Sequence, residues 1–572
     1  MEKNEKSLLK RYVPITDWIQ SYSFSSLKAD SRAGITVGIL LIPQGMAYAM
    51  LAGLPPIYGL YAAMAPLVIY TIFGTSHQLG IGPVAIISIL LAAGVGSITE
   101  PGSDEFIALA LVTAFLVGVT QLMMGVFQLG FLMNFVSKPV LSAFITGAAF
   151  IIGFSQAGNL LGVEIERSRY IYDVISELAV NLGEIHLATI LIGGSCILFI
   201  LIMKRWKPNF PAELLSVVLS IAIVWYFELD SAGVNVLGQV KAGIPSPMMP
   251  ELTSAPVLQL LPTVLAIAFL SFTQSFALAK TIARRHSENN IDPNQELYGL
   301  GLANMAGSFF HAYPVAGSFS RTAVNDENGA KTSISLLVSA VLVLLAILFL
   351  TPLINYLPQT VLAAIIITAV PGLVEIEEPK FLWKVRKREF ILTAITFIST
   401  LIFGILEGLG IGVIISLGIV IQRSSYPNIV MLGRIPDTKQ YRDLERHPEA
   451  LTQTNTIIVR IDSSLYFANT SYTRSKLEEL AITSGKNLEQ IVIDAVGINE
   501  VDATALHAIE ELIEDYKKRD IKLIIAGVKG PVRDIFERSG LDDVIGEEQF
   551  YLNITEAVKS LEDESEEESH RA

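Results

Sequence analysis

The stretch that decides the fold runs from residue 33 to residue 99: AGITVGILLIPQGMAYAMLAGLPPIYGLYAAMAPLVIYTIFGTSHQLGIGPVAIISILLAAGVGSIT. It contains no Asp, Glu, Lys or Arg. A helix that crosses a bilayer needs about 20 apolar residues, so this stretch has room for two or three such helices. A buried helix of a soluble protein keeps a polar face, which this stretch lacks. The stretch therefore predicts a protein embedded in a membrane.

The remainder of the chain extends this prediction. Hydrophobic residues make up 51% of the 572 positions and charged residues 17%, and the mean hydropathy is +0.51. Further charge-free runs cover residues 106–137, 139–163, 187–203, 214–227, 252–279, 297–320, 332–374, 390–406 and 408–422. Together these runs accommodate about a dozen or more spans. We expect an α-helical polytopic membrane domain over residues 33–425, after a polar cytoplasmic segment over residues 1–32.

Basic residues set the expected orientation, because short loops rich in Lys and Arg stay in the cytoplasm. Clusters at residues 204–207, 280–285 and 380–388 are all cytoplasmic if they follow the sixth, eighth and twelfth spans. Both termini are then cytoplasmic. Residues 1–32 lack the apolar core of a cleavable signal peptide, so none is expected. Cys196 is the single cysteine, which excludes a disulfide within the chain.

The composition changes after Arg423. Residues 456–462, 490–496 and 522–528 predict buried strands, and residues 472–483 and 502–518 predict helices, the second capped by Asp502. This alternation predicts a small cytoplasmic α/β domain over residues 426–560. The acidic residues 561–572 predict a disordered tail. With no phosphate-binding glycine loop, metal-spaced Cys/His set or Ser/His/Asp constellation in this domain, we expect no enzymatic activity.

Three segments of the membrane domain combine helix breakers with polar residues: IPQGMAY at 42–48, GTSHQLGIGPVA at 74–85 and YPVAGSFSRTAVN at 313–325. Free backbone groups at membrane depth are tolerated only around a cavity or in the protein interior. The tetrad x-Pro-Val-Ala occurs at 82–85 and at 313–316, once in each half. Interrupted spans in corresponding positions are how inverted-repeat transporters build a site in mid-membrane.

Two half-helix N-termini at such a site present unpaired N–H groups and partial positive charge, which favours an anion. Arg321 strengthens this interpretation, because it is an isolated cation beside the hydroxyls of Ser318, Ser320 and Thr322. The alternative is that Arg321 anchors a helix end and extends outward to water.

These segments, with Asn294-Gln295-Glu296-Leu297 and Gly301-Leu302-Ala303-Asn304, resemble the signature motifs of the SulP sulfate permease family. Residues 465–469 and 494–506 are similar to the STAS domain, named after sulfate transporters and anti-sigma factor antagonists. The resemblance spans essentially the whole chain. It implies about fourteen spans in two inverted repeats of seven, divided into a mobile core and a gate, in a homodimer.

The resemblance also implies the site. The anion would lie between the N-termini of the third and tenth spans, beside two residues of the first span. The residues so identified are Gln44, Tyr48, Pro83, Val84, Ala85, Ser318, Phe319, Ser320 and Arg321. Taken singly, Tyr48, Val84 and Phe319 are also compatible with plain packing roles. No metal or cofactor is implied, apart from a coupling ion, Na⁺ or H⁺.

One residue departs from the family pattern. Many relatives carry a glutamate in the eighth span, within Phe-x-Glu-Ser, that is thought to bind the coupling proton, and this chain has Gln274 there. Glutamine cannot titrate, so exchange, Na⁺ coupling or uncoupled movement gains weight over proton symport. Histidine is the side chain that ordinarily changes charge near neutral pH, which makes His77 and His311 alternatives for proton coupling, but a lone histidine at a helix end is more often a satisfied polar residue.

The STAS-like segment departs as well. Soluble anti-sigma factor antagonists carry a motif similar to Asp-Ser-Ser at the start of the helix, and a serine of this motif is phosphorylated. This chain has Asp502-Ala503-Thr504 there. We expect a structural or dimer-contacting role for this loop rather than a phosphorylation switch.

The sequence therefore predicts a secondary transporter that moves sulfate or a related inorganic anion by an elevator-like shift of the core. The expected location is a bacterial inner membrane, and no nucleic-acid partner is expected. Three alternatives stay open: a transporter of bicarbonate or another monovalent anion, a membrane-embedded sensor that signals through STAS, and a nucleobase permease. A nucleobase permease usually needs acidic residues that bind the base ring, and the matching spans of this chain lack them.

Overall fold

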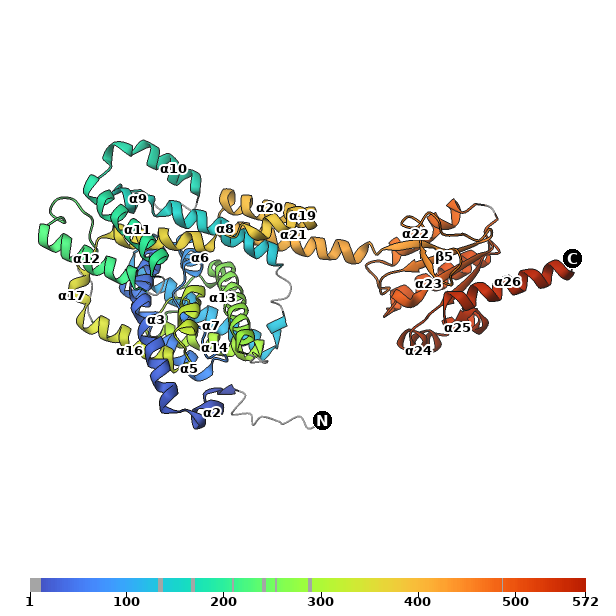
Figure 1. The fold of residues 1–572 in the computed structure, drawn as a ribbon, viewed down its shortest axis with the longest axis horizontal. Helices are drawn as coiled ribbons and strands as arrows, with labels where there is room; N and C mark the ends of the chain where they lie inside the picture. Colours follow the sequence, from blue (N-terminus) through green and yellow to red (C-terminus); the bar gives the residue numbers. More distant parts are fainter. Residues whose placement is uncertain are drawn as a thin grey trace. The chain divides into compact units, whose positions relative to one another are not determined.

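The computed structural model describes residues 12–131, 137–165, 170–207, 210–238, 243–252, 255–286, 291–485 and 487–571. Contacts divide the chain into two compact units, Met1–Ser416 and Leu417–Ala572 (Figure 1). The division falls inside helix α21 (Ile405–Ser425), and the boundary expected at residue 425 stays a prediction. Each unit is described by itself.

The first unit is helical. Its first half contains α2 (Ile15–Trp18), α3 (Phe24–Leu51), α4 (Ile57–Tyr61), α5 (Ala65–Phe73), α6 (Ala85–Val95), α7 (Asp104–Val126), α8 (Lys138–Ser155), α9 (Ala157–Leu161), α10 (Ile171–Val180), α11 (Leu187–Trp206) and α12 (Ala212–Phe227). Its second half contains α13 (Val257–Arg285), α14 (Pro293–Ser308), α15 (Phe319–Glu327), α16 (Ile334–Phe349), α17 (Thr351–Ile354), α18 (Gln359–Ala369), the 3₁₀ turn η4 (Val370–Leu373), α19 (Glu377–Val385), α20 (Lys387–Phe403) and α21.

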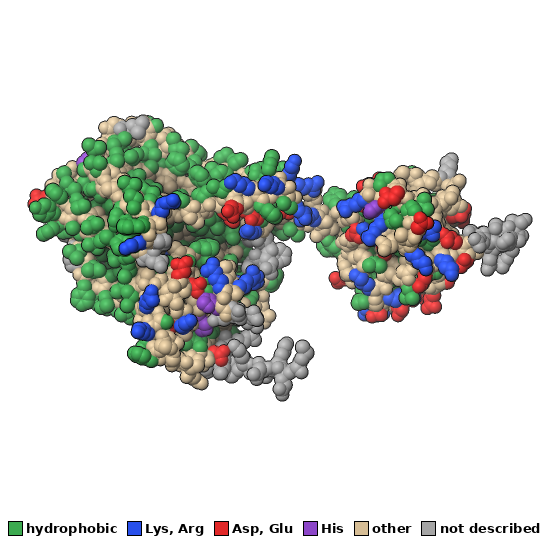
Figure 2. All heavy atoms as spheres, in the orientation of Figure 1, with side chains coloured by type: hydrophobic (Ala, Val, Ile, Leu, Met, Phe, Trp, Pro, Cys, Tyr) green, Lys and Arg blue, Asp and Glu red, His purple; other side chains and the backbone are tan. Residues whose placement is uncertain are grey.

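Seven helices among the described residues are long and apolar enough to cross a membrane, and four shorter apolar helices accompany them. Large apolar side chains remain exposed over much of this unit, as expected of a surface that faces lipid (Figure 2). The expected α-helical polytopic membrane fold is confirmed.

Helix α3 begins at Phe24 rather than at residue 33, where the charge-free run starts. Ser23 caps it by accepting a hydrogen bond from the Ser26 N–H at 3.2 Å. Asp30 lies in the early turns and is fully buried, because its carboxylate accepts bonds from the backbone N–H groups of Lys331 (2.6 Å) and Thr332 (3.0 Å). The charge-free run therefore marks the apolar part of the helix and not its start.

Small residues bring the two halves of the first unit into backbone contact. A Cβ added to Gly118 of α7 would lie 2.4 Å from the backbone nitrogen of Met305 in α14. A Cβ added to Gly301 would lie 2.9 Å from the carbonyl oxygen of Gly118. Close approach at small residues is how helices associate in membranes, where no hydrophobic effect drives them together.

Two short strands lie between these helices and pair with each other. Strand β1 (Ile81–Gly82) is antiparallel to β2 (Ala316–Gly317), with Ile81 opposite Gly317. Helices α6 and α15 begin within three residues of the ends of these strands, so both start inside the protein. The prediction of broken spans is confirmed, but the two Pro-Val-Ala tetrads are not equivalent, since Ala85 is the first residue of α6 whereas Ala316 lies in β2.

The second unit is a six-stranded sheet in the order β4-β3-β5-β6-β7-β8, with β5 to β8 parallel. Its strands are β3 (Ile429–Arg434), β4 (Tyr441–Asp443), β5 (Thr456–Ile461), β6 (Gln490–Asp494), β7 (Lys522–Ala526) and β8 (Phe550–Tyr551). Its helices are α22 (Thr470–Thr483), α23 (Ala503–Lys517), α24 (Gly530–Ser539), α25 (Leu541–Ile545) and α26 (Ile554–Arg571). The three strands and two helices predicted from the sequence are all present.

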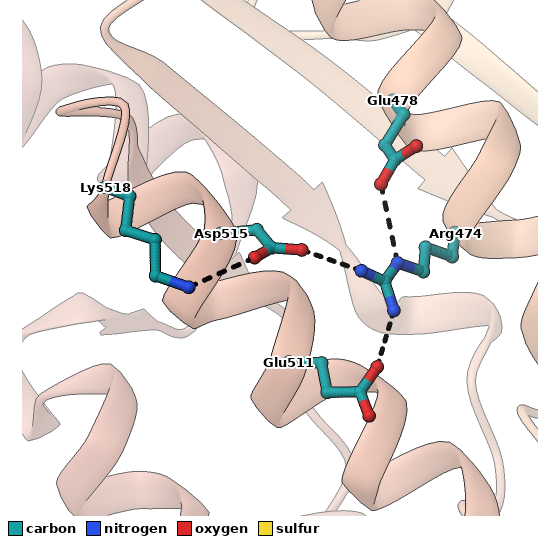
Figure 3. Close-up of polar contacts among 5 residues, drawn as sticks. All are labelled: Arg474, Glu478, Glu511, Asp515 and Lys518. Atoms are coloured by element: carbon teal, nitrogen blue, oxygen red, sulfur yellow. Dashed lines mark hydrogen bonds and ion pairs between the residues drawn. The ribbon is translucent and has the colours of Figure 1, made fainter.

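Helices α22 to α25 contribute to one apolar core of this sheet and α26 to another. Arg474 joins α22 to α23 by donating to Glu511 (2.5 Å) and Asp515 (2.7 Å), as Figure 3 shows. The backbone of α26 continues to Arg571, where the acidic composition predicted a disordered tail. Glutamate is a good helix former, so a glutamate-rich segment can extend an anchored helix.

Candidate functional site

A cavity of about 550 Å³ lies beside the start of the two half-helices. Its walls come from α3, α6, α11, α12, α13, α15, the end of α18 and η4. Seven of the nine residues predicted from the family resemblance line it, together with Gln274: Gln44, Tyr48, Val84, Ala85, Ser318, Phe319 and Ser320. Pro83 and Arg321 do not line the cavity.

The two half-helices are capped differently. Ser318 is the N-cap of α15, and its hydroxyl accepts from the Arg321 N–H and lies 3.3 Å from the Ser320 hydroxyl. Val84 is the N-cap of α6 and has no side-chain oxygen to offer. The first N–H groups of a helix have no partner within the helix, so both starts carry partial positive charge.

Arg321 is fully buried, with none of its side chain exposed. A Cβ added to Gly82 of β1 would lie 3.3 Å from its Nη2, so the guanidinium lies against the strand pair, behind the cavity wall. Its Nε, Nη1 and Nη2 have no hydrogen-bond partner among the described residues. Tyr48 and Tyr313 are close enough to interact with it electrostatically. The alternative that Arg321 extends outward to water is wrong.

A buried guanidinium without a partner is costly, because it loses its hydration and gains nothing in return. Such groups in native structures are paired with a charge or a ligand. A negative charge in the neighbouring cavity would stabilise this cation across the cavity wall, because an opposite charge favours the ionised form of a buried group.

Gln274 lies in α13 and faces the same cavity. Its Nε2 donates to the carbonyl oxygen of Gly317 at 2.7 Å, and its Oε1 has no partner among the described residues. The neighbouring Ser275 accepts from the Gly317 N–H at 2.8 Å. A glutamate in this place would make the first bond only when protonated, because a carboxylate is an acceptor and not a donor. Glutamine therefore always makes the hydrogen bond that a glutamate would make only in its protonated form.

A second set of buried amides holds the segment that leads into β2. The Oδ1 of Asn304, in α14, accepts from the Val315 N–H at 2.7 Å, and its Nδ2 donates to Gln121 Oε1 at 3.0 Å. Gln121 in turn donates to Ser271 of α13. The broken segment is therefore tied to α7, α13 and α14 by side chains. From the sequence, Asn304 stood out only as part of a family motif, and no role at the site was predicted for it.

One ion pair in the cavity wall was not predicted from the sequence. Lys204, at the end of α11, lies 3.1 Å from Glu213, in the first turn of α12. Both line the cavity, and Glu213 is buried. Lys204 was interpreted only as a sign of orientation. The signal for Glu213 was its place directly before the charge-free run that starts at residue 214.

The remaining candidates lie elsewhere. His77 contacts the ring of Trp18, and His311 contacts Tyr58 and Tyr61, and neither lines the cavity. In the second unit, Asp502 caps α23 by accepting from Ala505 N–H at 2.8 Å and also accepts from Phe467 N–H at 2.8 Å. Thr504 is exposed. Asp502 therefore joins two loops at the start of α23.

The chain matches the family model for the sulfate permease family over residues 27–396 and the model for the STAS domain over residues 447–557. It belongs to the sulfate permease family. It is therefore a multi-pass integral membrane protein that carries a C-terminal STAS domain, and membership assigns it to transporters rather than to enzymes.

Curated relatives extend the likeness over the whole chain. "Sulfate transporter 4.1, chloroplastic" of Arabidopsis thaliana is 39% identical over 96% of this chain and 82% of its own length. "High affinity sulfate transporter 1" of Stylosanthes hamata is 33% identical over 96% of this chain and 86% of its own.

Two solved structures share the fold. The murine Solute Carrier 26 family member A9 anion transporter, in an inward-facing state, matches with a TM-score of 0.90 at 24% identity, covering 98% of this chain and 95% of the other. The transmembrane domain of the cyanobacterial bicarbonate transporter BicA matches with a TM-score of 0.60 at 20% identity, covering 69% of this chain and 99% of the other. At these identities the likeness concerns the fold alone.

Proposed function

We propose that this chain is a secondary transporter of sulfate, and that the anion binds in the cavity between the starts of α6 and α15. The observation that carries the proposal is the fully buried, unpartnered guanidinium of Arg321. The names of three curated relatives, each a sulfate transporter, support the choice of anion.

In the proposed mechanism the two half-helices supply backbone N–H groups, and Ser318 and Ser320 supply hydroxyl donors. Arg321 compensates part of the anion's charge from behind the strand pair. Tyr48 and Gln44, from α3, close the opposite wall of the cavity. Because the donors belong to α6 and α15, which are paired through β1 and β2, the anion travels with these elements when they shift past the gate helices.

The cavity wall includes Lys204, which lies in a basic cluster of the kind that marks the cytoplasmic side. This placement supports an inward-facing state with both termini in the cytoplasm. We propose a homodimer as the working unit and a bacterial inner membrane as its location.

Proton coupling at position 274 is not part of this proposal. Gln274 keeps its bond to Gly317 at every pH, because an amide does not titrate. Movement is then driven by exchange, by Na⁺ or by the anion gradient alone.

The test is uptake of radiolabelled sulfate into proteoliposomes that contain the full chain. We expect uptake that does not change when a pH gradient is imposed at zero membrane potential, with Na⁺ and internal anions varied in parallel vesicles. If the vesicles take up bicarbonate but not sulfate, the proposed substrate is wrong. Absence of uptake for either anion would favour a sensor.

A further inference from the structure

The segment that follows η4 carries an unusual concentration of positive charge. Residues 380–388 read KFLWKVRKR, with five cations and no acid. The acidic side chains lie before it, at Glu375, Glu377 and Glu378, and directly after it, at Glu389. Figure 2 shows Lys and Arg side chains gathered where α19 and α20 lie, beside hydrophobic surface.

These cations lie at the surface, and no carboxylate of the described residues neutralises them. Lys380, Lys384, Arg386, Lys387 and Arg388 are all exposed to solvent. None of the five has a carboxylate partner within the described part of the chain, whereas the nearby Glu378 pairs with Lys138 of α8 at 2.5 Å. Their charge is therefore available to a ligand.

The same short helix also exposes large apolar side chains. Phe381, Trp383 and Val385 are between 57% and 58% exposed, whereas Leu382 faces inward. The Lys387 ammonium lies 5.9 Å from the centre of the Trp383 ring, and that ring contacts Phe390. Aromatic rings beside Lys and Arg are typical of a helix at the boundary between headgroups and acyl chains.

The course of the chain places α19 at that boundary. The apolar stretch Gln359–Val385 is long enough for one span, but α18 ends at Ala369. The turn η4 and the three residues 374–376 separate it from α19. Lys380 and Lys384 within α19, and the three cations that directly follow it at residues 386–388, exclude this helix from the hydrocarbon core. A basic loop between two spans lies on the cytoplasmic side.

We propose that the corner formed by residues 380–388 binds the headgroups of anionic phospholipids in the cytoplasmic leaflet. Charge complementarity is the argument for this ligand, because that leaflet is the negatively charged surface next to a cytoplasmic basic helix. The apolar side chains of Phe381 and Trp383 insert beside the acyl chains of the same lipids.

A role in transport rests on the function proposed above. Gly372 and Leu373, in η4, line the anion cavity, and the bond from Lys138 to Glu378 ties α19 to α8. Lipid bound at this corner holds α8, α18 and α20 at a fixed depth while α6 and α15 move. Lipid binding itself does not depend on which anion is carried, so the two proposals fail separately.

The test measures quenching of Trp383 fluorescence by brominated lipid. The full chain, with Trp18, Trp206 and Trp225 changed to Phe, is placed in two membranes of the same lipid composition. In one, the anionic phosphatidylglycerol carries bromine, and in the other an equal amount of phosphatidylcholine does. We expect about threefold stronger quenching by brominated phosphatidylglycerol, since each basic residue near the surface attracts anionic lipid.

Two variants separate charge from structure. Changing the five cations to Gln should make the two lipids quench equally, whereas changing Lys380, Lys384 and Lys387 to Arg should keep the preference. High salt should weaken the preference in the starting protein, which provides a test even if the Gln variant does not fold. Equal quenching by the two lipids in the starting protein overturns the proposal, and so does weak quenching by both, which would mean that protein covers the corner.

Discussion

The two helices that start in the middle of the membrane domain share a geometry and differ in chemistry. Both follow a strand of the β1–β2 pair, and the first residues of both line one cavity. The third residue of α6 is Ile87, and the third residue of α15 is Arg321, and both are fully buried. The N-caps are Val84 and Ser318.

This difference shows how a duplicated scaffold becomes a specific site. The paired strands place two helix dipoles, which any anion would feel. Of the two half-helices, only α15 and its N-cap bring a buried cation and hydroxyl groups to the site, so the two sides contribute unequally to charge and hydrogen bonding. If this interpretation is right, equivalent substitutions in the two helices should have unequal effects.

The largest expected effect is that of Arg321→Ala. It should reduce sulfate uptake by about 100-fold or more, since removing one partner of a buried charge pair costs several kcal/mol. Sulfate should also stop raising the melting temperature of the purified protein, because that shift depends on binding. Ile87→Ala is the matched control on α6 and should change uptake much less. Equal losses in the two variants would contradict the comparison.

Gln274→Glu should introduce pH dependence that the parent protein lacks. Uptake should fall by about tenfold as pH rises and the new carboxyl loses its proton, because it then cannot donate to Gly317 and it repels the anion. Uptake should recover on acidification. Gln274→Met, which removes the same bond without adding a charge, should lower uptake equally at all pH values. A flat profile for the Glu variant would argue against the cavity geometry.

Substitutions of the two residues of the ion pair in the cavity wall should change the KM for sulfate in opposite directions. Lys204→Gln leaves Glu213 uncompensated, so the KM for sulfate should rise by about threefold to tenfold. Glu213→Gln leaves Lys204 free to attract the anion, so the KM should fall. The double variant should return close to the parent value, as expected for two residues that act on each other. Shifts of the same sign would indicate a purely structural pair.

The caps should give the smallest effects. Ser318→Ala removes a helix cap and a hydroxyl donor, and the KM for sulfate should rise by about fivefold. Val84→Ser adds an equivalent cap to α6 and should change the KM by less than about twofold, because Arg321 and the Ser320 hydroxyl already lie on the other side. A large gain of affinity from Val84→Ser would show that α6 contributes more than its backbone.

Part of the site could be predicted because its residues are exceptions in their surroundings. Pro83, Gln44 and Arg321 stand out in apolar sequence, and the family resemblance then connected their segments. Lys204 and Glu213 do not stand out in this way, since they lie at helix ends where charges are ordinary. Their contact depends on how α11 and α12 meet, a distance that no local pattern encodes.

The sequence by itself determined that the chain is a polytopic membrane protein with an α/β domain at its C-terminal end. Charge-free runs and alternating strands and helices are local patterns, and lipid or water imposes them residue by residue. Only the tertiary structure decided that Arg321 is buried behind the strand pair, that Gln274 donates to Gly317, and that the two Pro-Val-Ala tetrads are not equivalent. Burial and pairing are relations between distant segments, so they exist only once the chain has packed.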